Sequence, residues 1–328
     1  MSATNCFERH VSLVISVTIV AALIAILGLI LPSGVSAGSG IWTSTGGPVV
    51  AGGQVNAIVV HPTIPNTVYA AVNVDTLNSA GKVYRTTDGA ANWSQVYAGT
   101  TQLNALAVTS TLVYAAGGQN YGENIIVKSG NSGSNWTAVF TGTDSNTNDV
   151  FNAIAINPST TNIVYAAGAE QAGSTNSNVV YRTEDGGTSW TQVFNRTQDC
   201  CGASLNALVI HPTTPTTVYV AGGEKGPDSQ YAVIYKTTNA GDPSPVWTQV
   251  YSTTDVSDFT ALVVDPNTNM LYVGTEGNGP NTVYSGGDDG SGWGQFITSG
   301  PQAGYRLALD LPNSTLYAST ENNRPYRE

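Results

Sequence analysis

Six polar residues follow a recurring tyrosine at nearly constant distance, and their types could do chemistry. The tyrosines are Tyr69, Tyr114, Tyr165, Tyr219, Tyr272 and Tyr317, and the polar residues four or five positions later are Asn73, Gln119, Glu170, Glu224, Glu276 and Glu321. Carboxylates and amides gathered on one face can bind a cation such as calcium, a basic partner, or the hydroxyl groups of a sugar. The alternative is a solvated acidic rim that keeps the protein soluble.

Three further residues complete this hypothetical ligand site. Tyr121 and Tyr231 lie in the same polar segments, and each offers a flat ring on which a sugar can stack. Arg306 stands where the other repeats have alanine and is interpreted as a countercharge to the carboxylates. No residue is assigned as catalytic, and the identity of any bound metal is left open. A second polar set, Asn56, Asn104, Asn152, Asn206 and Thr260, repeats near the start of each unit and is interpreted as structural hydrogen bonding.

The elements that must position these residues form an internal repeat of about 50 residues. Each unit carries a short glycine-containing turn that ends in tryptophan, and the best copy is Arg182-Thr183-Glu184-Asp185-Gly186-Gly187-Thr188-Ser189-Trp190. In such a turn a carboxylate or amide accepts backbone N–H groups, while glycine adopts positive φ. The predicted structural residues of the five turns are Asp88, Trp93, Asn131, Trp136, Asp185, Trp190, Asn239, Trp247, Asp288 and Trp293.

These turns resemble the Asp-box, or BNR repeat, with the pattern Ser/Thr-x-Asp-x-Gly-x-Thr/Ser-Trp. The resemblance extends over nearly all of the chain after residue 40, although Asn131 and Asn239 replace the aspartate. Families with this repeat include sialidases, sortilin-type receptors, xyloglucan-degrading glycosidases and photosystem II assembly factors. The resemblance implies a β-propeller, and because these families do unrelated things it implies no single activity.

Each unit reads as four short strands, which predicts an all-β fold with four-stranded blades. One such tyrosine in each unit predicts six blades. The last unit lacks the turn that ends in tryptophan and the fourth strand. Ile41-Trp42-Thr43 matches the fourth-strand sequence Trp190-Thr191-Gln192, so we predict that this N-terminal strand closes the last blade. The alternative is a seven-bladed propeller that is truncated.

The N-terminal region indicates export. Residues 11–31 form an uncharged, mostly apolar run of 21 residues, and Val35-Ser36-Ala37 follows as a small-residue cleavage site. Residues 1–37 are therefore either a signal peptide or an N-terminal membrane anchor. The body, residues 38–328, is predicted to be a secreted or extracytoplasmic propeller that meets a membrane only through residues 11–31, if they are retained. Cys200 and Cys201 are adjacent, and they form either a vicinal disulfide or two thiols.

Composition and repetition exclude several functions. Only 10% of residues are charged, and the net charge of −11 argues against a nucleic-acid partner. His61 and His211 share a repeat position with Asn157 and Asp265, so they are predicted to be turn residues rather than metal ligands. Arg85, Lys128, Arg182 and Lys236 share another position and are predicted to face outward on separate blades, which argues against the arginine triad of sialidases.

The sequence favours a non-enzymatic propeller over an enzyme. The leading hypothesis is an extracytoplasmic protein that binds a protein or glycan partner at the cell surface or in an envelope complex. No cofactor is expected, apart from calcium bound by the acidic residues that follow the tyrosines. The alternative is a glycoside hydrolase resembling the xyloglucan-degrading propeller enzymes. The strand and Asp-Pro turn of those enzymes resemble Leu262-Val263-Val264-Asp265-Pro266. That chemistry needs two carboxylates about 5–10 Å apart, and those enzymes pair two propellers whereas this chain has one.

Overall fold

The described part of the chain is built from antiparallel sheets. The computed structural model describes residues 47–48, 53–74, 80–118, 123–142, 149–173, 175–198, 204–226, 229–276, 282–297, 306–312, 315–319 and 326–327. These residues form six sheets, five with four strands and one with three, and they contain no helix. Consequently no described helix is long and apolar enough to cross a membrane. Residues 1–37 and the Ile41–Thr43 strand proposed for ring closure lie outside the described residues.

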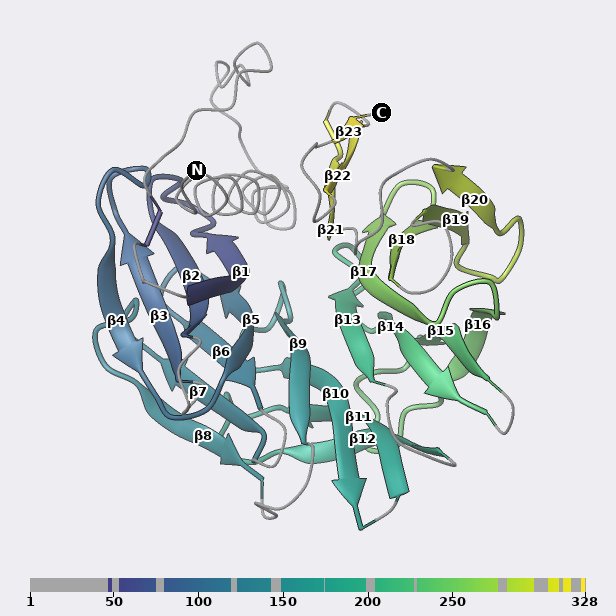
Figure 1. Cartoon of the computed structure of the whole chain (residues 1–328), viewed down its shortest axis with the longest axis horizontal. Coiled ribbons are helices and arrows are strands. Elements are labelled where there is room, and N and C mark those ends of the chain that lie inside the picture. Colours follow the sequence, from purple (N-terminus) through teal and green to yellow (C-terminus); the bar gives the residue numbers. More distant parts are fainter. Residues whose placement is uncertain are drawn as a thin grey trace, which may run out of the picture.

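The sheets are arranged like blades around a central axis, in chain order (Figure 1). Blade 1 contains β1 (Gly53–Val60), β2 (Val68–Val74), β3 (Gly81–Thr86) and β4 (Ser94–Ala98), and blade 2 contains β5 (Leu103–Val108), β6 (Val113–Gly117), β7 (Ile125–Ser129) and β8 (Thr137–Thr141). Blade 3 contains β9 (Val150–Ile156), β10 (Val164–Ala172), β11 (Thr175–Thr183) and β12 (Thr191–Gln198), and blade 4 contains β13 (Leu205–Ile210), β14 (Val218–Lys225), β15 (Gln230–Thr237) and β16 (Thr248–Thr253). Blade 5 contains β17 (Asp258–Asp265), β18 (Met270–Glu276), β19 (Val283–Gly287) and β20 (Gly294–Ile297), and blade 6 contains β21 (Arg306–Asp310), β22 (Thr315–Ser319) and β23 (Tyr326–Arg327).

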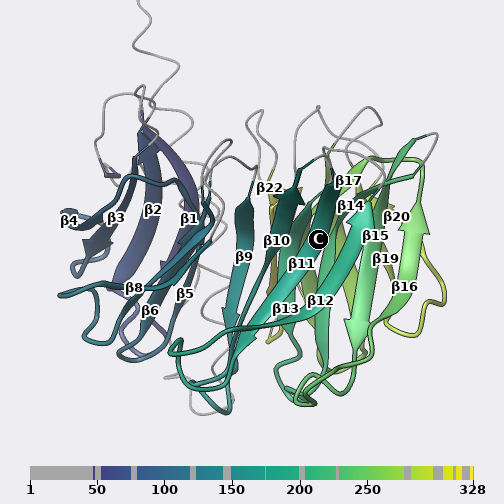
Figure 2. The same ribbon diagram turned by 90° about the horizontal axis from the view of Figure 1, so that it is seen from below.

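The strands run between two faces of the molecule, as the view turned by 90° shows (Figure 2). Turns between the first and second strands and between the third and fourth strands share one face, here called the turn face. The other face, here called the loop face, carries the ends of the second strands, including that of β10. The two kinds of connection therefore lie on opposite faces of the propeller.

The core lies between neighbouring blades rather than within one. One apolar cluster joins blades 3 and 4 through Tyr165, Leu205 and Val218, and equivalent clusters join the other successive blades. Each tryptophan from Trp136 onward packs against the blade that precedes it, and Trp190 lies edge-on to Phe140 of blade 2. Because apolar side chains of two sheets bury one another, no blade can complete its core alone.

A β-bulge near the start of each inner strand defines the channel. The sheet register skips one residue in each of blades 1 to 5, and the skipped residues are Asn56, Asn104, Asn152, Asn206 and Thr260. A bulge residue leaves the strand ladder and its side chain is re-aimed. The backbones approach closely here, since a Cβ added to Gly168 would lie 1.9 Å from the Val150 carbonyl oxygen. Glycine occupies the position opposite the bulge in blades 2, 3 and 4, as Gly117, Gly168 and Gly222, whereas Val72 and Thr275 occupy it in blades 1 and 5.

The re-aimed amides form a belt of hydrogen bonds around the channel. Asn56 Nδ2 donates to Asn104 Oδ1 at 3.2 Å, Asn104 to Asn152 at 3.4 Å, and Asn152 to Asn206 at 3.1 Å. Each amide also donates to a backbone carbonyl of the next blade, and Asn206 does so to Phe259 at 3.2 Å. Arg306 of blade 6 donates back to the Thr260 carbonyl at 3.0 Å. We call this set the amide belt, and it is the hydrogen-bonded ring that the repetition predicts.

The amide belt generates a stability prediction. In Asn152→Ala the hydroxyl of Ser204, the carbonyl of Leu205 and the amide of Asn206 all lose a donor. We expect unfolding free energy to fall by about 1–3 kcal/mol, because partly buried acceptors are left without a partner. Urea unfolding measures the change, with exposed Asn195→Ala as the matched control. Equal stability of the two variants would contradict a structural role for the belt.

Candidate functional site

Three of the predicted acidic residues, Glu170, Glu224 and Glu276, lie in strands rather than in loops. Glu170 belongs to β10 and pairs with Ser177, and Glu224 belongs to β14 and pairs with Tyr231. In blades 3 and 4 strand pairing extends as far as Ala172 with Thr175 and Lys225 with Gln230, into segments whose polar sequence is typical of loops. Glu170 and Glu224 still lie near the loop-face ends of their second strands, as their shared offset from the tyrosine requires.

Glu224 is held in a buried cluster between blades 3 and 4. Its side chain is 3% exposed, and its two carboxylate oxygens each accept a tyrosine hydroxyl, from Tyr231 and Tyr235, at 2.7 Å. Arg196 of blade 3 forms an ion pair with it at 3.6 Å. Tyr231 is therefore engaged by a protein carboxylate instead of standing free as a stacking platform. Burial and the nearby Glu224 raise the pKa of Tyr231 and Tyr235.

Glu170 occupies the same repeat position in a different environment. It is half-buried; Oε1 accepts the amide of Asn124 at 3.1 Å, and Oε2 accepts the Tyr181 hydroxyl at 3.0 Å and Gln192 Nε2 at 3.3 Å. Within the described part of the chain no lysine or arginine forms an ion pair with it. Asn124 belongs to blade 2, so Glu170 lies where blades 2 and 3 meet at the loop face.

Asp149 brings a second carboxylate to this position. It directly precedes β9, and the register that pairs Val150 with Ala169 puts Asp149 next to Glu170 on the adjacent strand. Its side chain is buried, and its Oδ1 accepts the backbone N–H of Gln171 at 2.8 Å. Opposite residues of an antiparallel pair have Cβ atoms about 5 Å apart. The two carboxyl groups are therefore close enough to influence each other's ionisation.

The environment raises the pKa of Glu170. Burial raises its pKa, the hydrogen bonds from Asn124 and Tyr181 oppose that rise, and the negative charge of Asp149 adds to it. The net effect is a pKa above the usual range for glutamate. Two neighbouring carboxyl groups, one of which has a raised pKa, are an arrangement that general acid catalysis uses. Asp149 was not among the predicted site residues, because its position opposite Glu170 depends on a register that a bulge sets.

The remaining predicted ligand residues are dispersed. Asn73 is buried and braces blade 2, since its Oδ1 accepts the Leu103 N–H at 2.8 Å. Arg306 is exposed at the start of β21, within the amide belt. Glu276 ends β18, and its side chain is outside the described residues, as are Gln119, Tyr121, Glu321, Cys200 and Cys201 in full. Ligand binding by this set stays a prediction.

The turns that end in tryptophan are braced from inside. In blade 3 Asp185 Oδ1 accepts the Thr183 hydroxyl at 2.8 Å and the Ser189 N–H at 2.9 Å. Two successive residues have positive φ, +70° at Gly186 and +98° at Gly187, and in blade 1 Ala90 takes the second position at +76°. Hydrogen bonds from Asn92 and Thr86 lower the pKa of Asp88 to about 2, and those from Ser189 and Thr183 lower the pKa of Asp185.

Asp288 of blade 5 differs from the turn brace that the sequence predicts. It accepts the Tyr219 hydroxyl at 2.6 Å and Lys236 Nζ at 2.7 Å, both from blade 4. The neighbouring Asp289 accepts the Ser291 N–H at 2.9 Å within the turn. The reason is the sequence Gly286-Gly287, which replaces the Ser or Thr that holds the carboxylate in the other turns.

The repeated basic residues do not face outward, so that prediction is wrong. Arg85 donates to the Ser132 carbonyl at 2.6 Å, Lys128 to the Gly186 carbonyl at 2.7 Å, and Arg182 to the Ala240 carbonyl. The second-strand tyrosine of the same blade donates to the same carbonyl in each case. A positive charge is best satisfied here by carbonyl oxygens that the left-handed turn of the next blade presents. These residues therefore join blades.

The turn histidines act as turn caps. His61 Nδ1 accepts the Ile64 N–H at 3.1 Å, and Asn157 Oδ1 accepts the Thr160 N–H at 3.0 Å at the equivalent position. His211 accepts the Thr214 N–H at 3.1 Å in the same way. No group of three or more metal-ligating side chains occurs among the described residues. Calcium on the acidic residues stays a prediction.

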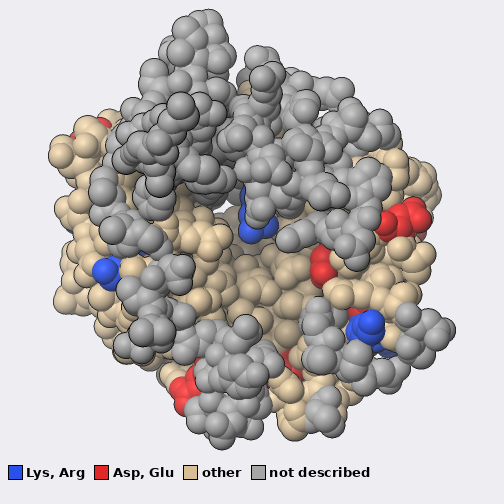
Figure 3. All heavy atoms as spheres, viewed as in Figure 1, with Lys and Arg blue, Asp and Glu red and all other residues tan. Residues whose placement is uncertain are grey.

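The charged side chains on the loop face are dispersed. Figure 3 shows small separate groups of both signs on a mostly uncharged surface, wherever described residues are seen. This pattern differs from the strongly negative face that six gathered polar residues would give. Burial of Glu224 and pairing with Arg196 account for part of the difference. The Glu170–Asp149 pair is consequently a local feature rather than part of an acidic field.

Solved structures similar to this chain are propellers, several of them glycoside hydrolases. The GH74 enzyme of Niastella koreensis matches with 20% identity and a TM-score of 0.61, over 83% of this chain and 44% of the enzyme. The GH74 xyloglucanase of Xanthomonas campestris matches with 17% identity and the same TM-score and coverage. Kuenenia stuttgartiensis hydrazine synthase matches with 15% identity and a TM-score of 0.60, over 88% and 77%. No family model and no curated protein sequence matches the chain.

These comparisons establish the propeller fold and correct the functional hypothesis. At such identities they show the fold alone, and the chain spans less than half the length of the GH74 enzymes. The comparison contradicts the leading interpretation, a non-enzymatic binding propeller, because GH74 glycoside hydrolases recur among the similar structures. The alternative, a glycoside hydrolase, is favoured in its place. Location and partners stay predictions.

Glu170 generates a prediction about pH. The pKa of Glu170 is raised in the folded state, so its protonated form contributes to stability. This contribution is fully present below the unfolded-state pKa of about 4.3. It is lost as pH rises through the folded-state pKa. Glu170→Gln lacks this loss. The melting temperature of the variant minus that of the parent should therefore increase between about pH 4 and pH 7.

Asp185→Asn is the control with the opposite sign. The lowered pKa of Asp185 contributes stability that is present above the unfolded-state pKa and is lost as pH falls. The melting temperature of this variant minus that of the parent should become more negative as pH rises from about 2 to 5. A flat difference for Glu170→Gln across its range would show that burial does not disfavour its charge.

Proposed function

We propose that this protein is a glycoside hydrolase that acts on a polysaccharide at its loop face. The observation that carries the proposal is the pair of neighbouring carboxyl groups, Glu170 and Asp149, of which Glu170 has a raised pKa. Similarity of the fold to GH74 hydrolases supports the reaction class. A Cβ separation of about 5 Å is compatible with the roughly 5–5.5 Å between carboxyl groups in retaining glycosidases.

The roles follow from the two environments. Glu170 donates its proton to the glycosidic oxygen as the bond from that oxygen to the anomeric carbon breaks, and the Asp149 carboxylate attacks that carbon. Water then displaces Asp149, and Glu170 accepts the proton of that water. Tyr181, Gln192 and Asn124 hold Glu170 in one orientation. Glu224, at the same repeat position, is buried and its carboxylate is occupied by Arg196, Tyr231 and Tyr235, so it is not assigned a role in the reaction.

Activity on polysaccharides tests the proposal. Purified full-length chain should release reducing ends from xyloglucan or another soluble β-glucan. Glu170→Gln and Asp149→Asn should each lower kcat by about 10²-fold or more, the usual contribution of an acid–base group. Asp185→Asn, in an exposed turn, should retain the parent's kcat. No release by the parent from any glucan, or undiminished turnover by Glu170→Gln, would exclude this assignment.

We further propose that the chain is an Asp-box propeller with six blades. The braced turns at Asp88 and Asp185, with their paired positive-φ residues, support the Asp-box resemblance. Six described sheets support the blade number. Blade 6 has three strands among the described residues, and the likeness of Ile41-Trp42-Thr43 to Trp190-Thr191-Gln192 supports an N-terminal strand as its fourth.

Deletion of residues 38–45 tests ring closure. Loss of the closing strand would expose the edge of blade 6, so thermal unfolding should become less cooperative and aggregation should increase. Deletion of residues 2–37 alone is the control and should leave unfolding cooperative. If both deletions melt like the parent, the closure is wrong and a different blade arrangement is required.

A further inference from the structure

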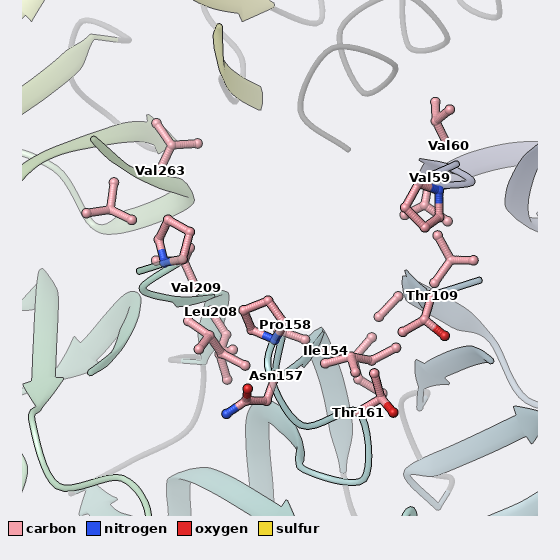
Figure 4. Close-up of a pocket in the computed structure, with 18 of the residues that line it drawn as sticks. Val59, Val60, Thr109, Ile154, Asn157, Pro158, Thr161, Leu208, Val209 and Val263 are labelled. Carbon is pink, nitrogen blue, oxygen red and sulfur yellow. The ribbon is translucent and has the colours of Figure 1, made fainter. Parts of the chain in front are cut away.

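A cavity opens on the turn face, opposite the carboxylate pair. Its volume is about 580 Å³, within the range of small-molecule sites. The inner strand of every blade contributes to its wall, for example through Val59, Ala107, Ile154, Leu208, Leu262 and Leu307. Figure 4 shows these elements surrounding an open centre, with Val209 and Val263 on its left, Ile154 below it and Val59 on its right. The cavity is therefore part of the central channel.

The amide belt lies deeper in the channel than the cavity wall, and none of its residues is part of the lining. Ile154 and Leu208 follow the belt residues Asn152 and Asn206 by two positions, which is roughly 7 Å along a strand. The belt amides are already hydrogen-bonded to one another and to backbone carbonyls. The channel therefore changes from a satisfied polar ring at depth to an apolar wall near the mouth.

The lining selects an uncharged aliphatic ligand. Among the described residues that line the cavity none is charged or aromatic, and most are Val, Leu, Ile, Ala or Pro. A sugar would lose the hydration of its hydroxyl groups here without a replacement partner or a stacking ring. A carboxylate would meet no cation. An alkyl chain would instead remove apolar wall surface from water, which is favourable without directional bonds.

The mouth provides for one neutral polar head group. Thr63, Ser110 and Thr161 line it on the side of blades 1 to 3, and Pro212 lines it on the side of blade 4. We propose that this cavity binds an aliphatic chain that ends in a neutral hydroxyl or ester group, with the chain directed toward the amide belt. The site is independent of the proposed hydrolase activity, because it opens on the other face.

Displacement of a fluorescent probe tests this site on the full-length protein. N-phenyl-1-naphthylamine should bind saturably, and decan-1-ol should displace it with one-to-one stoichiometry. The double variant Val209→Thr, Val263→Thr keeps side-chain size while adding two hydroxyl groups to the wall, and it should lower decan-1-ol affinity about 10-fold or more. Val246→Thr is the matched control, because Val246 is 69% exposed and is not part of the lining.

Two other ligands decide the chemistry, and melting curves verify that every variant is folded. Decanoate, which also has ten carbon atoms but ends in a charged carboxylate, should bind more weakly than decan-1-ol. Cellotriose should not displace the probe. A filling variant, Ala155→Leu, should reduce probe capacity without a polar change. Failure of decan-1-ol to displace the probe, equal loss in Val246→Thr, or displacement by cellotriose instead would each overturn the proposal.

Discussion

The β-bulge in the inner strands is the constraint on which this propeller depends. Among the described residues, no backbone ladder longer than the isolated bridge between Gly118 and Val150 crosses from one blade to the next, so most of the contacts that join blades are made by side chains. By skipping one residue, each of the first five inner strands turns an asparagine or threonine out of its own ladder. In four of them the amide then reaches a carbonyl of the next blade. In blades 2 to 4 a glycine of the second strand lies opposite the bulge, where the two backbones come close together.

A second set of contacts joins the blades at the turn face. Tyrosine and a basic residue converge on one carbonyl that is presented by a left-handed pair in the following turn. The amide belt and these contacts lie at different depths of the channel, so neighbouring blades are held at two levels. Such two-level attachment resists both sliding and opening of the interface. It leaves the loop-face ends of blades 2 and 3 in fixed register, and that register places Asp149 beside Glu170.

The repeat made much of the fold predictable, and residues outside it were less so. Turn roles of His61 and His211 followed from equivalence with Asn157 and Asp265, and the structure gives these residues matching contacts. Glu170 and Glu224 were placed in loops because the segment Thr175–Asn178 is polar, although it continues the hairpin by pairing. The contact of Arg182 with the next blade was also not predictable. Alternation along a strand shows which face of the sheet a side chain lies on, but not which neighbouring blade covers that face. The difference between Glu170 and Glu224 depends on Arg196, a single residue with no counterpart in the repeat.

Arg306 makes one blade interface chemically unlike its neighbours. The amides of blades 1 to 4 all donate forward, whereas Arg306 of blade 6 donates backward to blade 5. A ring of identical repeats would have no such reversal, so this interface is a seam. Neutral amide pairs are insensitive to dissolved ions, while a guanidinium is surrounded by counterions whose density follows salt concentration. Within the amide belt, ionic strength therefore acts on this contact rather than on the neutral amide pairs.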